Sequence, residues 1–197
     1  MGSSHGASRI IRQAYPDGLY TEYLLEGHPM WRDLQAEAGE TLIDECGLFY
    51  FGPEASHQIQ SVIHNLEHLK VPHELHGPSS VAKVFDGLKL EAGEIGVFTP
   101  EAGLVDAEAA VRASIRLAES RGAHVLAGKV ANREMVEANY DAFVVCAGAW
   151  IRDWVPVPVR VTLQTLAYLD VAVRGPVWIE DIGPQAYGLP NDRLGFK

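Results

Sequence analysis

The sequence predicts an α/β fold whose strands gather towards the C-terminal end. Stretches with one apolar stripe at helical spacing alternate with short apolar runs that are typical of buried strands. Residues 106–121 form the clearest helix, Gly122 is placed to end it, and the apolar run 123–126 follows at once. This order is the helix-to-strand half of a βαβ unit, and the later apolar runs favour an antiparallel end.

Three helices are expected from apolar spacing. The first covers residues 20–37, with a break expected between Gly27 and Pro29 because both residues disfavour a continuous helix. The second covers residues 55–70 and carries one apolar stripe. In the third, residues 106–121, Asp106 occupies the N-cap position.

The strand candidates are short apolar runs bounded by glycine, proline or polar residues. The longest run, residues 155–173, alternates only in part between apolar and polar residues, which predicts a long strand or one arm of a hairpin. The candidates are residues 47–51, 95–98, 123–126, 143–150, 155–173, 177–179 and 186–189.

Composition narrows the class of protein. The chain has 197 residues, of which 47% are hydrophobic and 21% charged, a globular balance that excludes a disordered chain. No apolar run approaches the roughly 18 residues that span a bilayer. The net charge of -10 disfavours a nucleic-acid partner, which needs clustered positive charge. Only Cys46 and Cys146 occur, and no signal peptide is visible, so we expect a cytoplasmic protein.

Two kinds of motif can be weighed before any resemblance is considered. His64, Glu67 and His68 form an HxxEH pattern, which inverted zinc peptidases use, although nothing fixes a third ligand and a solvated helix face explains it as well. Arg9 and Arg12 fit either an ordinary surface or an anion clamp, because a guanidinium fork suits a carboxylate. No GxGxxG dinucleotide fingerprint occurs in the sequence.

Several segments, taken in order, resemble one family. Residues 2–12 (GSSHGASRIIR) are similar to a motif of the monomeric sarcosine oxidase and N-methyltryptophan oxidase family, within the D-amino-acid-oxidase-like flavoproteins. The stretch EAGLVD with its alanine-rich helix, the run VVCAGAW and the C-terminal YGLP and GFK segments also resemble that family. The matching segments are residues 101–123, 144–150, 187–190 and 195–197.

The resemblance implies an enzyme that uses flavin adenine dinucleotide (FAD). Such an enzyme oxidises the C–N bond of a secondary or N-methyl amino acid, and oxygen then reoxidises the flavin to give hydrogen peroxide. Its substrate is a small amino acid with a carboxylate. The resemblance also implies no metal, and no nucleic-acid or membrane partner is expected.

The resemblance assigns a role to each matching residue. His5 and Arg9 lie beside the flavin ring, where a cation stabilises the reduced flavin. Arg12 holds the substrate carboxylate, Tyr187 belongs to the substrate pocket, and Lys197 serves oxygen activation. The further residues implied to bind the cofactor are Ser4, Val130, Gly148, Ala149 and Trp150.

The resemblance also implies a division of the chain into two interleaved lobes. Residues 1–52 and 104–156 correspond to an incomplete FAD-binding Rossmann-like lobe, and residues 53–103 and 157–197 to part of a substrate lobe with a mixed or antiparallel sheet. The chain matches the middle half of such an enzyme, so we expect a truncated product that is inactive alone. A non-catalytic binding module, self-associating through open sheet edges, is the alternative.

Overall fold

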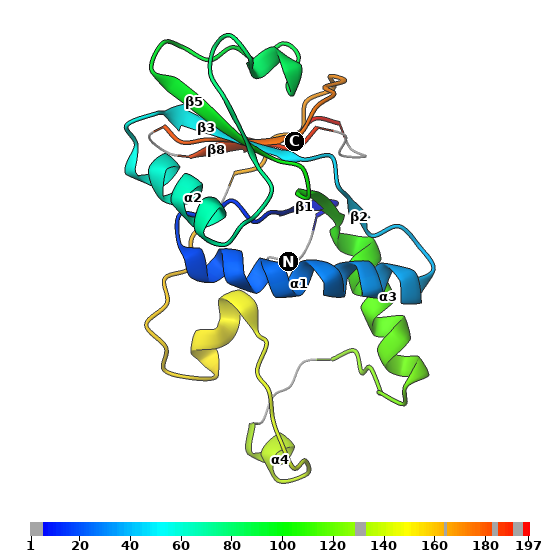
Figure 1. The fold of residues 1–197 in the computed structure, drawn as a ribbon. Coiled ribbons are helices and arrows are strands. Elements are labelled where there is room, and N and C mark those ends of the chain that lie inside the picture. The colour runs from blue at the N-terminus through cyan, green and yellow to red at the C-terminus, as the bar shows by residue number, and fades with distance from the viewer. Residues whose placement is uncertain (1–5, 129–132, 164, 183–184, 191–194) are drawn as a thin grey trace.

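The computed structural model describes residues 6–128, 133–163, 165–182, 185–190 and 195–197 (Figure 1). Within these residues the strands form one sheet of order β1-β6-β2 and a second of order β4-β5-β3-β7-β8. The strands are β1 (Ser8–Ile11), β2 (Ile43–Asp44), β3 (Leu48–Pro53), β4 (Glu74–His76), β5 (Glu94–Thr99), β6 (Gly103–Asp106), β7 (Val177–Glu180) and β8 (Ala186–Gly188). The helices are α1 (Gly18–Ala38), α2 (His57–His68), α3 (Ala107–Ser120) and α4 (Arg133–Glu137), with 3-10 turns η1 (Val81–Lys83) and η2 (Gly148–Asp153). The predicted α/β fold class is confirmed.

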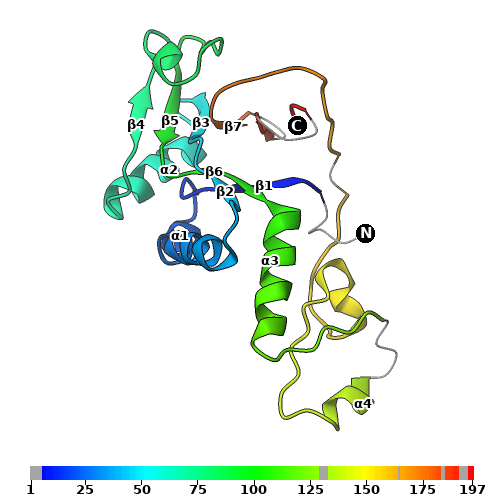
Figure 2. The same ribbon diagram turned by 90° about the vertical axis from the view of Figure 1, so that its right-hand side faces the viewer.

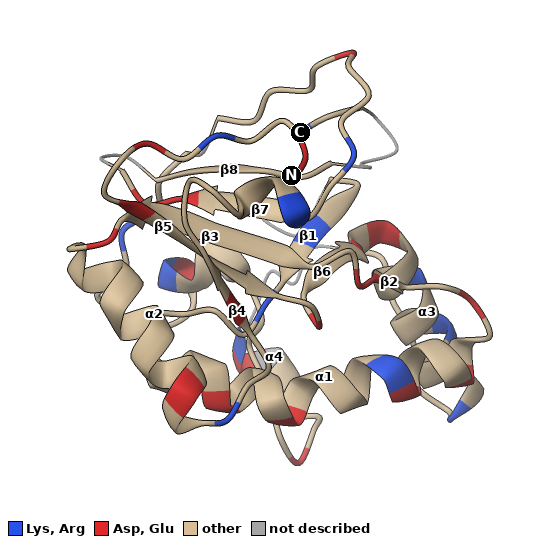
Figure 3. Ribbon diagram, turned by 45° about the horizontal axis from the view of Figure 1, so that its top comes forward, with Lys and Arg blue, Asp and Glu red and all other residues tan. Residues whose placement is uncertain are grey.

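The five-stranded sheet is mixed, whereas the apolar runs of the sequence favour an antiparallel arrangement. Its central strand β3 pairs antiparallel with β5 and parallel with β7. Helix α2 covers one face through the buried stripe of Ile59, Val62 and Leu66, which joins the main core. The segment 77–93 supplies residues that cover the opposite face, where the core is rich in aromatic side chains. Figure 3 shows Asp and Glu on the helices, while β3 and β7 are drawn almost entirely without charge.

The three-stranded sheet joins the N-terminal segment to the rest of the fold. Strand β6 pairs antiparallel with both β1 and β2, and Arg9 lies opposite Val105. Ile10 packs against the main core whereas Ile11 belongs to a second core beneath α1 and α3, as strand alternation requires. Figure 2 shows α3 extending away from this sheet, with α4 beyond its far end.

Helix α1 is continuous, so the break expected between Gly27 and Pro29 is wrong. Asp17 caps its start by accepting a hydrogen bond from the backbone N–H of Leu19, and Gly39 ends it in the left-handed region. Proline costs the helix one backbone hydrogen bond. Side-chain contacts of the neighbouring turns with other elements, described below, hold the helix across this point.

The other two predicted helices are confirmed with small changes at their ends. Ser56 caps α2, and the Asp106 carboxylate accepts a hydrogen bond from the N–H of Ala109 at 2.9 Å, as predicted for the third helix. Gly122 adopts a φ of 93° just after α3, which explains why the helix stops there.

Four of the strand candidates are confirmed and three are wrong. Strands β3, β5, β7 and β8 match the predicted runs. Residues 123–126, 143–150 and 155–173 form no strand in the described part of the chain, apart from one bridge between Leu169 and Phe196. Their apolar side chains are exposed instead, at 85% for Leu126, 80% for Val144 and 100% for Leu163. An apolar run forms a strand only beside a neighbouring strand, and none of these runs has one among the described residues.

The predicted two-lobe division stays a prediction.

Among the described residues, no helix combines the length and the apolarity needed to cross a membrane.

Candidate functional site

Arg12 is the centre of the candidate site. It follows β1 directly, and its Nη1 atom is buried without a hydrogen-bond partner among the described residues. Its guanidinium carbon lies 4.1 Å from the centre of the Tyr15 ring, a cation–π contact that offsets part of the cost of burial. The ring face cannot satisfy an N–H group, so Arg12 keeps an unmet donor that an anionic ligand could take.

Helix α2 holds the loop that carries Tyr15. The Asn65 Nδ2 group donates hydrogen bonds to the carbonyl oxygens of Tyr15 at 3.1 Å and of Pro16 at 2.9 Å. Two donors from one amide fix the backbone of this loop against α2. The position of the Tyr15 ring, and with it the guanidinium of Arg12, therefore depends on Asn65.

The hydroxyl group of Tyr50, a buried phenol on the five-stranded sheet, is the next polar group of the candidate site. Tyr50 is fully buried on β3, and its hydroxyl lies 3.3 Å from Asp181 Oδ1 and 3.3 Å from Gln185 Nε2. Ser56 donates to the other Asp181 oxygen at 2.6 Å. Burial, with the Asp181 charge, raises the pKa of Tyr50 to about 12, and the positive charge of Arg12 partly opposes that rise. The phenol is therefore a neutral hydrogen-bond donor at neutral pH.

Arg9 and Lys197, which the family resemblance places at the flavin, meet at one backbone atom. The Nη1 of Arg9 and the Nζ of Lys197 both donate to the carbonyl oxygen of Ser8, at 2.7 and 3.0 Å. Backbone hydrogen bonds between Lys197 and Leu189 hold the end of the chain beside β8. Residues separated by almost the whole sequence are thus brought together, and two cationic side chains converge next to β1.

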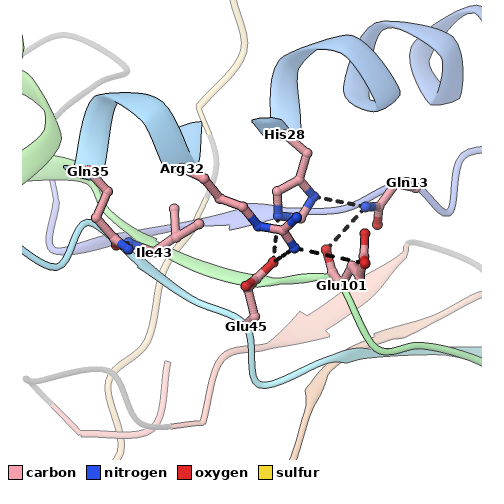
Figure 4. A network of polar contacts seen from close by, with 7 residues as sticks. All are labelled: Gln13, His28, Arg32, Gln35, Ile43, Glu45 and Glu101. Atoms are coloured by element: carbon pink, nitrogen blue, oxygen red, sulfur yellow. Dashed lines mark hydrogen bonds and ion pairs between the residues drawn. The ribbon is translucent and has the colours of Figure 1, made fainter. Parts of the chain in front are cut away.

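A polar network anchors the backbone next to Arg12 to helix α1 (Figure 4). Gln13 Nε2 lies 2.9 Å from His28 Nδ1 and donates to the Glu101 carbonyl oxygen at 3.1 Å. His28 Nε2 lies 2.9 Å from Glu45 Oε1, so this buried ring on α1 contacts both the segment after β1 and the segment after β2. These contacts start one residue before Pro29 and stabilise α1 where the proline weakens it.

The outer end of this network is an ion pair. Arg32 Nη2 lies 2.6 Å from Glu45 Oε1 and 3.9 Å from Glu101 Oε1. The hydrogen bond from Arg32 lowers the pKa of Glu45 from its ordinary value, although burial opposes this shift. Gln35 Oε1 accepts from the N–H groups of Leu42 and Ile43, which joins α1 to β2.

The other predicted site residues that the structure describes lie on β8 and in η2. Tyr187 lies on the edge strand β8 with its side chain exposed. Gly148, Ala149 and Trp150 form the start of η2 rather than the end of a buried strand, so the expected strand-to-turn geometry is wrong. Figures 1 and 2 both place that segment below the two sheets. Ser4, His5 and Val130 lie outside the described residues.

The HxxEH pattern lies on α2, as expected, with His64 and His68 on its exposed face. In the described ranges, no group of three or more histidine, cysteine or acidic side chains could hold a metal ion. A hydrolytic zinc site needs a third protein ligand, so the zinc hydrolase alternative gains no support from the described residues.

Sequence reasoning missed several residues around Arg12. Tyr50 was hidden in the apolar run 47–51, and Asn65 in a motif that pointed to metal binding. Tyr15 follows Arg12 by three residues, and this short spacing could have indicated the contact between its ring and the Arg12 guanidinium. Asp181 offered no local signal, because its partners come from distant parts of the chain.

Comparison with protein families gives one match over almost the whole chain. The family described as "FAD dependent oxidoreductase" matches residues 1–194. Human peroxisomal sarcosine oxidase is 30% identical over 95% of this chain and 50% of its own length. The N-methyl-L-tryptophan oxidase of Yersinia pestis (strain Pestoides F) is 29% identical over 79% of this chain and 45% of its own length. The chain spans about half the length of these curated relatives.

Solved structures show the same fold. The L-proline dehydrogenase from P. horikoshii has a TM-score of 0.70 over 99% of this chain and 59% of its own, at 14% sequence identity. The open form of NikD, an unusual amino acid oxidase essential for nikkomycin biosynthesis, has a TM-score of 0.52 at 26% identity. That match covers 61% of this chain and 32% of the other.

Proposed function

Since the chain belongs to the family of FAD dependent oxidoreductases, we propose that it forms part of an enzyme that oxidises the C–N bond of a secondary or N-methyl amino acid. The curated relatives are named for sarcosine and N-methyl-L-tryptophan, which both combine an N-methyl amine with a carboxylate. A small substrate with these two groups is therefore proposed here as well.

The unmet Nη1 donor of Arg12 is the observation that carries the proposal. A buried charged donor without a partner is costly, and an anionic ligand would remove that cost. A carboxylate satisfies a guanidinium with two parallel charge-assisted hydrogen bonds. Tyr15 and Asn65 hold Arg12 in place before the ligand arrives, so little ordering is needed on binding.

The cofactor proposed for this site is FAD, which when bound accepts a hydride from the substrate carbon. Arg9 and Lys197 suit a position beside a group that gains negative charge, because both are cations on the same side of β1. Lys197 is proposed to serve oxygen, with hydrogen peroxide as product. Ser4, His5, Val130 and residues 148–150 stay proposed cofactor contacts, and Tyr187 a proposed substrate contact.

Three finer points belong to the same proposal. We propose that these 197 residues alone do not complete the reaction, because the GxGxxG loop that binds a dinucleotide pyrophosphate does not occur among them. Self-association through sheet edges is proposed to use β4 or β8, the outer strands of the larger sheet in the described residues. A reducing, cytoplasmic setting stays proposed from the free Cys46 and Cys146.

Calorimetric titration with sarcosine tests the role of Arg12 without needing turnover. We expect Arg12→Met to weaken sarcosine binding by about ten- to a hundredfold, because a hydrogen bond to a charged group contributes about 1.5–3 kcal/mol. The sarcosine affinity of Arg12→Lys should lie between those of the parent and Arg12→Met, since lysine keeps the positive charge but loses the forked guanidinium. Sarcosinamide, which lacks the carboxylate, should bind the parent weakly and be insensitive to both variants. Equal sarcosine affinity in parent and Arg12→Met would contradict the proposal.

A further inference from the structure

The described histidines differ in how their ring nitrogens are used. His28, His57, His73 and His76 each have a polar contact, with Gln13, Ser61, the Val71 carbonyl and Glu74 respectively. His64 and His68 have no hydrogen-bond or ion-pair partner among the described residues. The two rings do stack on each other: they are nearly parallel, and their centroids lie 6.0 Å apart.

The placement of this pair follows from the period of α2. Residues four apart lie on the same face of a helix, one turn from each other. The buried stripe of α2, built on Ile59, Val62 and Leu66, faces the sheet, so both imidazoles are exposed on the other side. Figure 1 shows α2 along the outside of the molecule. The rings are therefore open to ions in solution.

We propose that His64 and His68 form a surface chelate for a divalent transition-metal ion, with Cu²⁺ the preferred ion and water completing its coordination. Imidazole nitrogen suits Cu²⁺, Ni²⁺ and Zn²⁺, and a given nitrogen site binds Cu²⁺ most strongly of these. Two histidines four residues apart on a helix can reach one ion about 2.0–2.1 Å from each nitrogen after small side-chain rotations. Both rings have their nitrogens available, so no existing hydrogen bond must break.

The site differs from the zinc hydrolase that the HxxEH pattern predicts. A hydrolytic zinc site needs a third protein ligand, and the described residues contain no group of three side chains that could hold a metal ion. Asn65 is committed to Tyr15 and Pro16. His57 lies almost two turns from His64, about 10 Å along the axis, too far to share the ion. The chelate therefore has two protein ligands, one fewer than a hydrolytic zinc site needs.

Metal binding at this position would stabilise α2. The two ligands lie in consecutive turns near the C-terminal end of the helix, so an ion that bridges them holds those turns in helical form. An ion that binds the folded chain more tightly than the unfolded chain raises the melting temperature, and the rise grows with the logarithm of the ion concentration once that exceeds the Kd.

The test is a Cu²⁺ titration of the full chain, with all variants in a Cys146→Ser background because an exposed thiol also binds and reduces Cu²⁺. The unsubstituted pair should bind one Cu²⁺, raise the melting temperature and give nitrogen splitting from two imidazoles in the electron paramagnetic resonance spectrum. His64→Gln and His68→Gln should each weaken binding at least tenfold, because the second ring of a chelate binds as an intramolecular ligand.

His57→Gln is the matched control, since His57 is exposed on the same helix and has its own partner, Ser61. It should leave Cu²⁺ affinity unchanged. Affinity that survives both His64→Gln and His68→Gln, or that falls only in His57→Gln, would overturn the proposal. A spectrum with fewer than two imidazole nitrogens in the unsubstituted pair would overturn it too, whatever the stability of the variants.

Discussion

Replacing Asn65 by alanine tests how the Arg12 loop is held. The change removes two hydrogen bonds to backbone carbonyls, those of Tyr15 and Pro16. At about 1 kcal/mol for each bond, the direct loss is about 2 kcal/mol. Alanine returns about 0.6 kcal/mol through its better helix propensity. We therefore expect the free energy of unfolding to fall by about 1.5 kcal/mol.

Asn65→Asp is the sharper variant because it keeps the shape of the side chain and removes the donor. Its carboxylate would face the same two carbonyl oxygens, so we expect a loss of about 3 kcal/mol. Urea unfolding followed by circular dichroism measures both values, with an unchanged m-value. Glu67→Ala, at an exposed position of the same helix, should stay within about 0.5 kcal/mol of the parent. An Asn65→Ala variant as stable as Glu67→Ala would refute the reasoning.

Two further variants test the sheet core and the ion pair. A Cβ at Gly96 would overlap the ring of Phe49, so Gly96→Ala should cost about 1–3 kcal/mol in thermal unfolding. Gly27→Ala meets open space in α1 and should instead gain up to about 1 kcal/mol through helix propensity. Equal melting temperatures of the two variants would contradict this. Arg32 lowers the pKa of Glu45 in the folded chain, so the ion pair contributes its full stability at pH values above the ordinary Glu pKa of 4.5. That contribution is lost as the pH falls through the lower pKa that Glu45 has in the folded chain. Glu45→Gln should therefore flatten the fall of the urea midpoint below that pH, and identical pH profiles would show that the pair does not contribute.

Local signals in the sequence predict the elements whose ends are fixed by their own side chains. Asp106 caps α3 as its position predicts, and Gly122 follows the last turn of that helix. The strand predictions failed where a partner strand was needed. Leu126 and Val144 lie in apolar runs as convincing as β3, yet they are exposed because no described strand pairs with them.

The candidate site was predictable only in part, for a related reason. The residue types of Arg9, Arg12 and Lys197 indicated anion chemistry through the family resemblance. Their surroundings depend on contacts between distant segments: Lys197 reaches the Ser8 carbonyl across 189 positions. No periodicity or spacing in the sequence encodes such a contact, so only the structure shows it.

The measurement that tests the central claim most directly is the absorption spectrum of FAD mixed with the purified chain and titrated with sarcosine. FAD is used at a saturating concentration, which compensates for the GxGxxG loop that does not occur among these residues. The claim is that substrate carboxylate and flavin share the site next to β1. It predicts a saturable sarcosine-dependent change in the flavin spectrum, which Arg12→Met should shift to at least about tenfold higher sarcosine concentration. A flavin spectrum that the folded chain and sarcosine leave unchanged, or a sarcosine response that is the same in Arg12→Met, would contradict it.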